Sequence, residues 1–218
     1  MIKIILPTLL SVMMILSRCW TKTIQLSSVE KLSPDNIPQS VNVESKSNGL
    51  IDELEGNFVD FSVENEEDAD KVIYYVSDLI QCKDPENELR ITYVEDALVS
   101  KVYYFTQYYN DLPIDGYVTS LFVNKDNNAV ECFKNSYIPN ISVDTNPKFT
   151  KDDLIKMISD EYESEIDGVP ELKVSFAYTR LTGSPQLVWY TRINNHDVSY
   201  LTVDANNGKV LYEEGPQY

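Results

Sequence analysis

The clearest pattern of apolar and polar positions lies near the end of the chain, in residues 186–214. Three runs of alternating apolar residues are separated there by two segments rich in Asn, Asp and Gly. Alternation at every second residue is typical of strands, and Asn, Asp and Gly tolerate the left-handed backbone that tight turns require. Leu187, Trp189 and Ile193 are expected on one face of the first strand. The pattern predicts three antiparallel strands, at 186–193, 198–203 and 209–212.

Apolar residues recur at every third or fourth position from 66 to 80, which predicts a helix with one buried stripe. Its first turn is acidic, as the helix dipole favours. Four runs of aromatic and β-branched residues follow, at 89–94, 101–109, 117–123 and 129–137. One helix packed on a four-stranded antiparallel meander is expected here.

A second helix is predicted after Thr150. Thr150 is a good N-cap, Asp153 stands at the third helical position of a capping box, and Phe149 can pack on Leu154. A strand at 171–178 and the three strands described first complete this part. The fold class expected is therefore α+β, in two small units that each pack a helix on an antiparallel β-meander. Their similar order suggests an internal duplication, although no residue-level repeat is visible.

Residues 1–19 have the pattern of a secretory signal peptide. Lys3 precedes an uncharged run from 4 to 16 that is shorter than a comfortable bilayer crossing. This pattern predicts export, so the protein is expected to be secreted or at the cell surface. The segment ending at Cys19 is also similar to a bacterial lipobox, although arginine precedes the cysteine where a small residue is usual. Lipidation of Cys19 and an uncleaved anchor therefore stay open, and the signal or such an anchor is the expected link to a membrane.

The remaining chain divides by composition. Residues 20–56 are rich in Ser, Asn and Pro and predict a polar, disordered linker. Two folded domains are expected, at 57–140 and 149–218, joined by a connection at 141–148.

The charge of the chain limits its partners. Its 18 basic and 35 acidic residues give a formal net charge of −17. Such a protein repels phosphate backbones, so nucleic acid and anionic membrane surfaces are poor partners, whereas a basic protein surface would be attracted. Most of the carboxylates are expected simply to keep an exported protein in solution.

Two sequence motifs carry a resemblance to a known family. Residues 103–116 resemble the strand, turn and strand of the fungalysin/thermolysin propeptide (FTP) domain, with Asp111 where glycine is usual. Residues 186–190 and 200–211 resemble the closing segment of a PepSY-type domain. Both occur in the family's order and together account for about residues 58–214. The matching residues are Gln107, Pro113, Gly116, Trp189, Asp204, Ala205 and Gly208.

The resemblance is to the pro-region of a thermolysin-like (M4) metallopeptidase without its catalytic domain. It implies a propeptide that assists folding of a secreted zinc peptidase and keeps it inactive until cleavage. The peptidase itself needs His-Glu-x-x-His, whereas this chain has a single histidine, His196. The chain is therefore expected to be non-catalytic, without cofactor or metal, and to act on a secreted metallopeptidase in trans as inhibitor or folding helper. A cell-surface binding module tethered through Cys19 and a truncated peptidase precursor remain alternatives.

Other chemistry finds little support in the sequence. A serine triad using His196 lacks the nucleophile elbow, and no glycine-rich phosphate loop is present. In an exported protein, Cys82 and Cys132 could form a disulfide between the end of the first helix and the last strand of its sheet. Two separate buried thiols are the alternative. Fifteen tyrosines, several of them around the 103–117 hairpin, suggest a surface for a protein partner.

Overall fold

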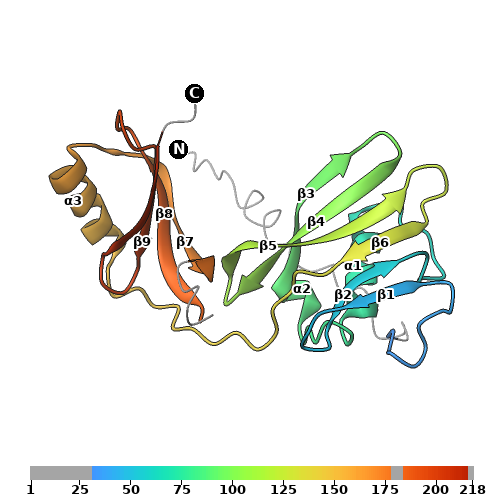
Figure 1. The fold of residues 1–218 in the computed structure, drawn as a ribbon. Helices are drawn as coiled ribbons and strands as arrows, with labels where there is room; N and C mark the ends of the chain where they lie inside the picture. The colour runs from blue at the N-terminus through green and yellow to red at the C-terminus, as the bar shows by residue number, and fades with distance from the viewer. Residues whose placement is uncertain (1–30, 178–183, 216–218) are drawn as a thin grey trace, which may run out of the picture. The chain divides into compact units, whose positions relative to one another are not determined.

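The computed structural model describes residues 31–177 and 184–215, and its fold is α+β, as the sequence predicts (Figure 1). Three helices and ten strands are present in these ranges. The helices are α1 (Glu66–Val76), α2 (Pro85–Glu88) and α3 (Lys151–Tyr162). The strands are β1 (Asn42–Ser45), β2 (Ile51–Glu55), β3 (Leu89–Asp96), β4 (Ser100–Tyr109), β5 (Leu112–Asn124), β6 (Val130–Lys134), β7 (Ile166–Ser175), β8 (Gln186–Ile193), β9 (Tyr200–Asp204) and β10 (Val210–Glu214).

The first core lies between α1 and the sheet that contains β2 to β6. Asn65 caps α1 by accepting a hydrogen bond from the backbone of Asp68, and the helix buries one stripe, as predicted. The helix ends at Val76, before the predicted end at 80, and the chain continues as turns. Leu79 and Ile80 are nevertheless buried, so the apolar stripe extends beyond the helix itself.

The first sheet contains the predicted meander and two further strands. Strands β3, β4, β5 and β6 pair antiparallel in that order. Strand β6 also pairs with β2, and β2 with β1. These two strands come from the stretch predicted as a disordered linker, so that prediction is wrong for residues 31–56. Five scattered apolar residues in this stretch are buried, two of them adjacent, namely Leu32, Val41, Leu50, Ile51 and Leu54. The polar composition between them masked this signal.

The second core lies between α3 and strands β7 to β10, with α3 along one face of the sheet (Figure 1). The predicted capping box is present, because Thr150 and Asp153 exchange hydrogen bonds at the start of the helix. Leu187, Trp189 and Ile193 share the buried face, as predicted. Strands β7 to β10 form an antiparallel meander. Strand β7 begins at Ile166, earlier than predicted, and the predicted strand end at 178 lies outside the described residues.

Strand β5 also reaches the second sheet. Its turn from β4 is only Asn110 and Asp111, both with positive φ, whereas the sequence predicted a longer turn through 116. The register of β4 and β5 shifts after Thr106, so residues 114–117 leave β4. There Ile114 pairs in parallel with Val174 of β7, and this is the one parallel pairing among the described strands.

The turns that close the two sheets share one hydrogen-bond pattern. In the β5–β6 turn, the side chain of Asn124 accepts a hydrogen bond from the backbone amide of Asp126. The backbone amide of Asn124 donates to the carbonyl of Ala129. In the β9–β10 turn, the side chain of Asp204 likewise accepts from the backbone amide of Asn206, and its backbone amide donates to the carbonyl of Lys209. The register shifts just beyond both turns. This correspondence supports the internal duplication that the order of elements suggested.

Candidate functional site

The PepSY-like motif residues gather around Phe149, which precedes the N-cap of α3. The indole N–H of Trp189 donates to the carbonyl of Phe149 at 2.8 Å, and the amide of Phe149 donates to the carbonyl of Ala205 at 2.8 Å. Gly208 has a φ of +76°, and a Cβ placed on it would lie 2.5 Å from the ring of Phe149. These residues therefore fix the start of α3 on its sheet.

Asp204, the remaining residue of this motif, serves the β9–β10 turn. Its buried carboxylate accepts hydrogen bonds from Gln186 at 2.8 Å, from the amide of Asn206 at 2.7 Å and from the side chain of Asn207 at 2.9 Å. A carboxylate with three internal donors is already satisfied. Asp204 is therefore a structural residue.

Gln107, the central residue of the FTP-like motif, binds a neighbouring segment of backbone. Its amide oxygen accepts from the amide of Ile138 at 2.9 Å, and its amide nitrogen donates to the carbonyl of Ile138 at 2.7 Å. Gln107 is buried at the register shift where β5 leaves β4. The side chain thus satisfies both backbone groups of Ile138. Pro113 of β5 pairs with Tyr108 of β4. Gly116 lies in the bulge of β5 with a φ of +81°.

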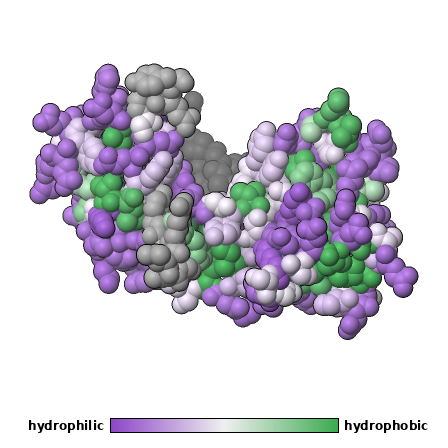
Figure 2. All heavy atoms as spheres, in the orientation of Figure 1, coloured by the Kyte–Doolittle hydropathy of each residue, from purple (hydrophilic) through white to green (hydrophobic). Residues whose placement is uncertain are grey.

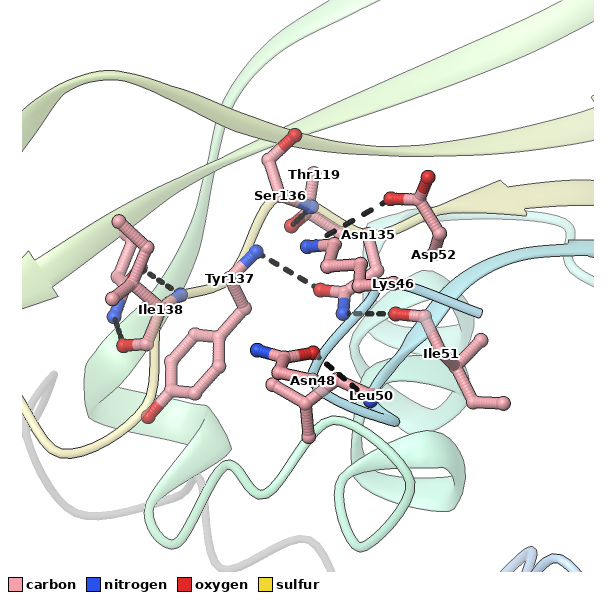
Figure 3. Close-up of polar contacts among 11 residues, drawn as sticks. Lys46, Asn48, Leu50, Ile51, Asp52, Thr119, Asn135, Ser136, Tyr137 and Ile138 are labelled. Atoms are coloured by element: carbon pink, nitrogen blue, oxygen red, sulfur yellow. Dashed lines mark hydrogen bonds and ion pairs between the residues drawn. The ribbon is translucent and has the colours of Figure 1, made fainter. Parts of the chain in front are cut away.

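Further buried polar groups hold the segment after β6 (Figure 3). The side chain of Asn135 donates to the carbonyl of Ile51 at 2.7 Å and accepts from the amide of Tyr137 at 2.9 Å. Thr119 accepts from the amide of Ser136 at 3.2 Å. The amide of Asn135 donates to the carbonyl of Asp52 in β2 at 2.8 Å, and beyond Asn135 side chains fix the path of this segment. Residues 137 and 138 border two hollows, of about 440 and 360 Å³.

The larger hollow lies beside α2 and the β4–β5 turn and has a mixed charge. Arg90 donates to the carboxylate of Asp111 at 2.5 Å and to the carbonyl of Asn87 at 3.2 Å, and its guanidinium lies 4.3 Å from the ring centre of Tyr108. Lys83 and Asp84 also line the hollow. Sequence reasoning missed this group, because Arg90 and Asp111 are far apart in the chain.

Glu88 borders the same hollow and accepts hydrogen bonds from Tyr137 and Cys82. Burial, together with the charge of Glu88, raises the pKa of the Cys82 thiol to about 12. Burial and the bond to Glu88 also raise the pKa of Tyr137 well above its usual 10. Both groups are therefore protonated at neutral pH, and a protonated thiol is a poor nucleophile. The arrangement is suited to structure or polar recognition rather than to nucleophilic chemistry.

The two cysteines are free in the structure, so the predicted disulfide between Cys82 and Cys132 is not present. The reason is the alternation of side chains along β6. Phe133 points into the first core, as Cys82 does, whereas Cys132 points to the opposite face and donates to Glu53 at 3.1 Å. Cys82 and Cys132 are therefore two separate thiols, which was the alternative to the disulfide. Cys19, the candidate for lipidation, lies outside the described residues.

The described ranges contain no cluster of side chains suited to histidine or metal chemistry. His196 is exposed in the β8–β9 connection, with Nδ1 at 3.2 Å from Asp197. Among the described residues, no three His, Cys, Asp or Glu side chains gather where they could hold a metal ion. None of the described helices has the length and apolar character needed to cross a membrane.

Leu98, the most exposed large apolar residue of the described ranges, lies beside Val99 at the end of the β3–β4 hairpin. Leu98 is 94% exposed and Val99 is 69% exposed, and an apolar patch stands there on the surface in Figure 2. On the adjoining sheet face, Tyr93 is 60% exposed and stacks on Tyr104 with ring centres 5.6 Å apart. Sequence reasoning missed Leu98 and Val99. The available signal was an apolar pair in the turn between two predicted strands, where polar residues are usual.

Comparison with known proteins finds similarity among solved structures alone. No protein-family model and no curated protein matches the sequence. Among solved structures, the Bacillus megaterium YpeB C-terminal domain is similar, with a TM-score of 0.42 and 10% identity over 87% of this chain and 100% of that chain. The resemblance to the pro-regions of thermolysin-like peptidases rests on the sequence motifs.

Proposed function

We propose that this chain is an exported, non-catalytic, propeptide-like protein that binds a thermolysin-type metallopeptidase and inhibits it or assists its folding. The sequence supports this proposal through two motifs of such pro-regions in the family's order. In that family the pro-region acts by contact with the peptidase, without chemistry of its own.

The observation that carries the proposal is the role of the motif residues. Gln107 holds the segment after β6, and Trp189, Ala205 and Gly208 fix α3 on its sheet. Residues that maintain a scaffold indicate that the motifs specify a shape rather than a reaction centre. A protein of this kind acts through the surface that its scaffold presents.

The outer face of the first sheet offers such a surface. Tyr103 and Leu121 point into the first core, so their neighbours Tyr104 and Phe122 lie on the face away from α1. Tyr93 stacks on Tyr104 there. Aromatic side chains with polar tips are enriched in protein interfaces, where they bury a large area at a small cost in entropy.

Titration of the purified mature protein against the metallopeptidase secreted by the same organism tests the proposal. The rate of peptide hydrolysis is expected to fall as the proteins approach equal concentrations, or the yield of refolded peptidase to rise. A serine peptidase in place of the metallopeptidase is the control, and gel electrophoresis shows whether the chain is merely consumed as a competing substrate. An unchanged rate together with an unchanged refolding yield would end the proposal.

A further inference from the structure

The turn of the β3–β4 hairpin, Ala97, Leu98 and Val99, is called the hairpin tip here. Two adjacent apolar side chains are exposed there, Leu98 at 94% and Val99 at 69%. The corresponding turn of the second sheet does not show this exposure at the position that matches Val99. The carbonyl of Val99 accepts from the amide of Lys125, and in the second unit the carbonyl of Leu187 accepts from the amide of Ala205 in the same way. Leu187 is fully buried at the equivalent position.

The hairpin tip is held in place by Lys125 from the neighbouring β5–β6 turn. The amide of Lys125 donates to the carbonyl of Val99 at 3.1 Å. Its ammonium group donates to the carbonyl of Ala97 at 3.1 Å and pairs with Asp96 at 2.6 Å. An apolar group that is already ordered loses little conformational entropy when it binds. The hairpin tip therefore has the character of a preformed anchor.

Acidic residues outnumber basic ones around the hairpin tip: Glu95, Asp96, Asp126 and Glu131 stand against Lys101 and Lys125. Glu95 and Asp96 precede it in β3, and Glu131 accepts from the hydroxyl of Ser100 at 3.1 Å. The whole chain carries a net charge of −17. An anionic lipid surface or a second copy of the chain would meet electrostatic repulsion here, whereas a basic protein surface would be attracted.

We propose that the hairpin tip inserts Leu98 and Val99 into an apolar pocket that is bordered by basic residues on the partner protein. The identity of that partner as a secreted metallopeptidase rests on the proposed function. Apolar anchors in pockets carry a large share of binding energy in interfaces, and surrounding charges speed association and set its salt dependence.

The test compares a variant with Leu98→Ser and Val99→Ser with the wild-type protein. Val169→Ser is the matched control, since Val169 is 77% exposed on β7. Circular dichroism and urea midpoints verify that each variant is folded. Calorimetric titration against the metallopeptidase secreted by the same organism is expected to show a Kd at least about tenfold higher for the hairpin-tip variant. The control should bind within about twofold of wild type, and added salt should weaken wild-type binding.

The outcomes separate the two proposals. Wild-type binding that the hairpin-tip variant retains within twofold overturns the anchor and leaves the proposed function intact. Absence of wild-type binding and of any effect on refolding overturns both. Sedimentation with phosphatidylglycerol vesicles, or concentration-dependent dimers in ultracentrifugation, that depend on Leu98 and Val99 would instead assign the hairpin tip to lipid or to a second copy, and would also overturn the proposal.

Discussion

Replacement of Gly208 by alanine tests how α3 is fixed to its sheet. The new Cβ would lie 2.5 Å from one ring atom of Phe149 and 2.7 Å from another. The backbone of Phe149 is held through its amide by Ala205 and through its carbonyl by Trp189, so only the ring can move to relieve the contact. A steric conflict with the ring is therefore expected in addition to the strain of the backbone.

The expected loss has two parts. An L-residue in the left-handed backbone conformation costs about 1–2 kcal/mol. Forcing an extra methyl group into a packed site costs about 1–3 kcal/mol more. The free energy of unfolding of Gly208→Ala should thus fall by about 2–5 kcal/mol, a large share of the stability of a domain of this size.

Gly116 provides the matched control. Its φ is +81°, close to that of Gly208, but no atom lies within 4 Å of a Cβ built there. Gly116→Ala should therefore show the backbone cost alone, about 1–2 kcal/mol. Urea unfolding followed by circular dichroism gives both values from the midpoints and slopes.

The difference between the two variants isolates the contact with Phe149. Combining Gly208→Ala with Phe149→Leu should recover part of the additional loss, because the two side chains are in contact. Equal destabilisation by Gly208→Ala and Gly116→Ala would refute the account of Phe149 as the anchor of α3.

Three further predictions concern buried polar groups. Gln107→Ala should lower the free energy of unfolding by about 2 kcal/mol, because two backbone groups lose their partners, and an unchanged urea midpoint would contradict this. Burial raises the pKa of both Cys82 and Cys132 to about 12, so both should react slowly with iodoacetamide in the native protein. Unfolding without reductant should expose two alkylatable thiols, and mass spectrometry that finds none would show a disulfide after all. Hydrogen bonds within the capping box lower the pKa of Asp153 from its usual 3.8. Its contribution to stability is therefore present above about pH 4 and lost as the pH falls through the lowered pKa. The difference in urea midpoint between wild type and Asp153→Ala should accordingly shrink below about pH 4, and a constant difference would argue against this linkage.

The candidate site could be predicted only in part. The motif residues Gln107, Trp189 and Gly208 were identified from sequence, but their partners Ile138 and Phe149 were not. Each of these partners lies about 30 residues or more from the residue that binds it, and no local pattern encodes such pairs. The exposure of Leu98 and Val99 was likewise hidden, because an apolar pair in a turn looks the same whether it is covered or free.

By itself the sequence determined the local structure of this protein. The spacing of apolar residues placed the stripe of α1, the alternation in β8 placed Trp189 on the buried face, and Thr150 with Asp153 marked the start of α3. These features depend on residues only a few positions apart.

Only the tertiary structure decided the features that arise from distant contacts. Strand β2, from the polar stretch before residue 57, pairs with the edge of β6. The bulge in β5 places Ile114 beside Val174 of β7. The alternation along β6 turned Cys132 away from the core that holds Cys82. The physical reason is that the free energy of such contacts depends on which segments meet, and that is settled when the chain packs rather than by its local pattern.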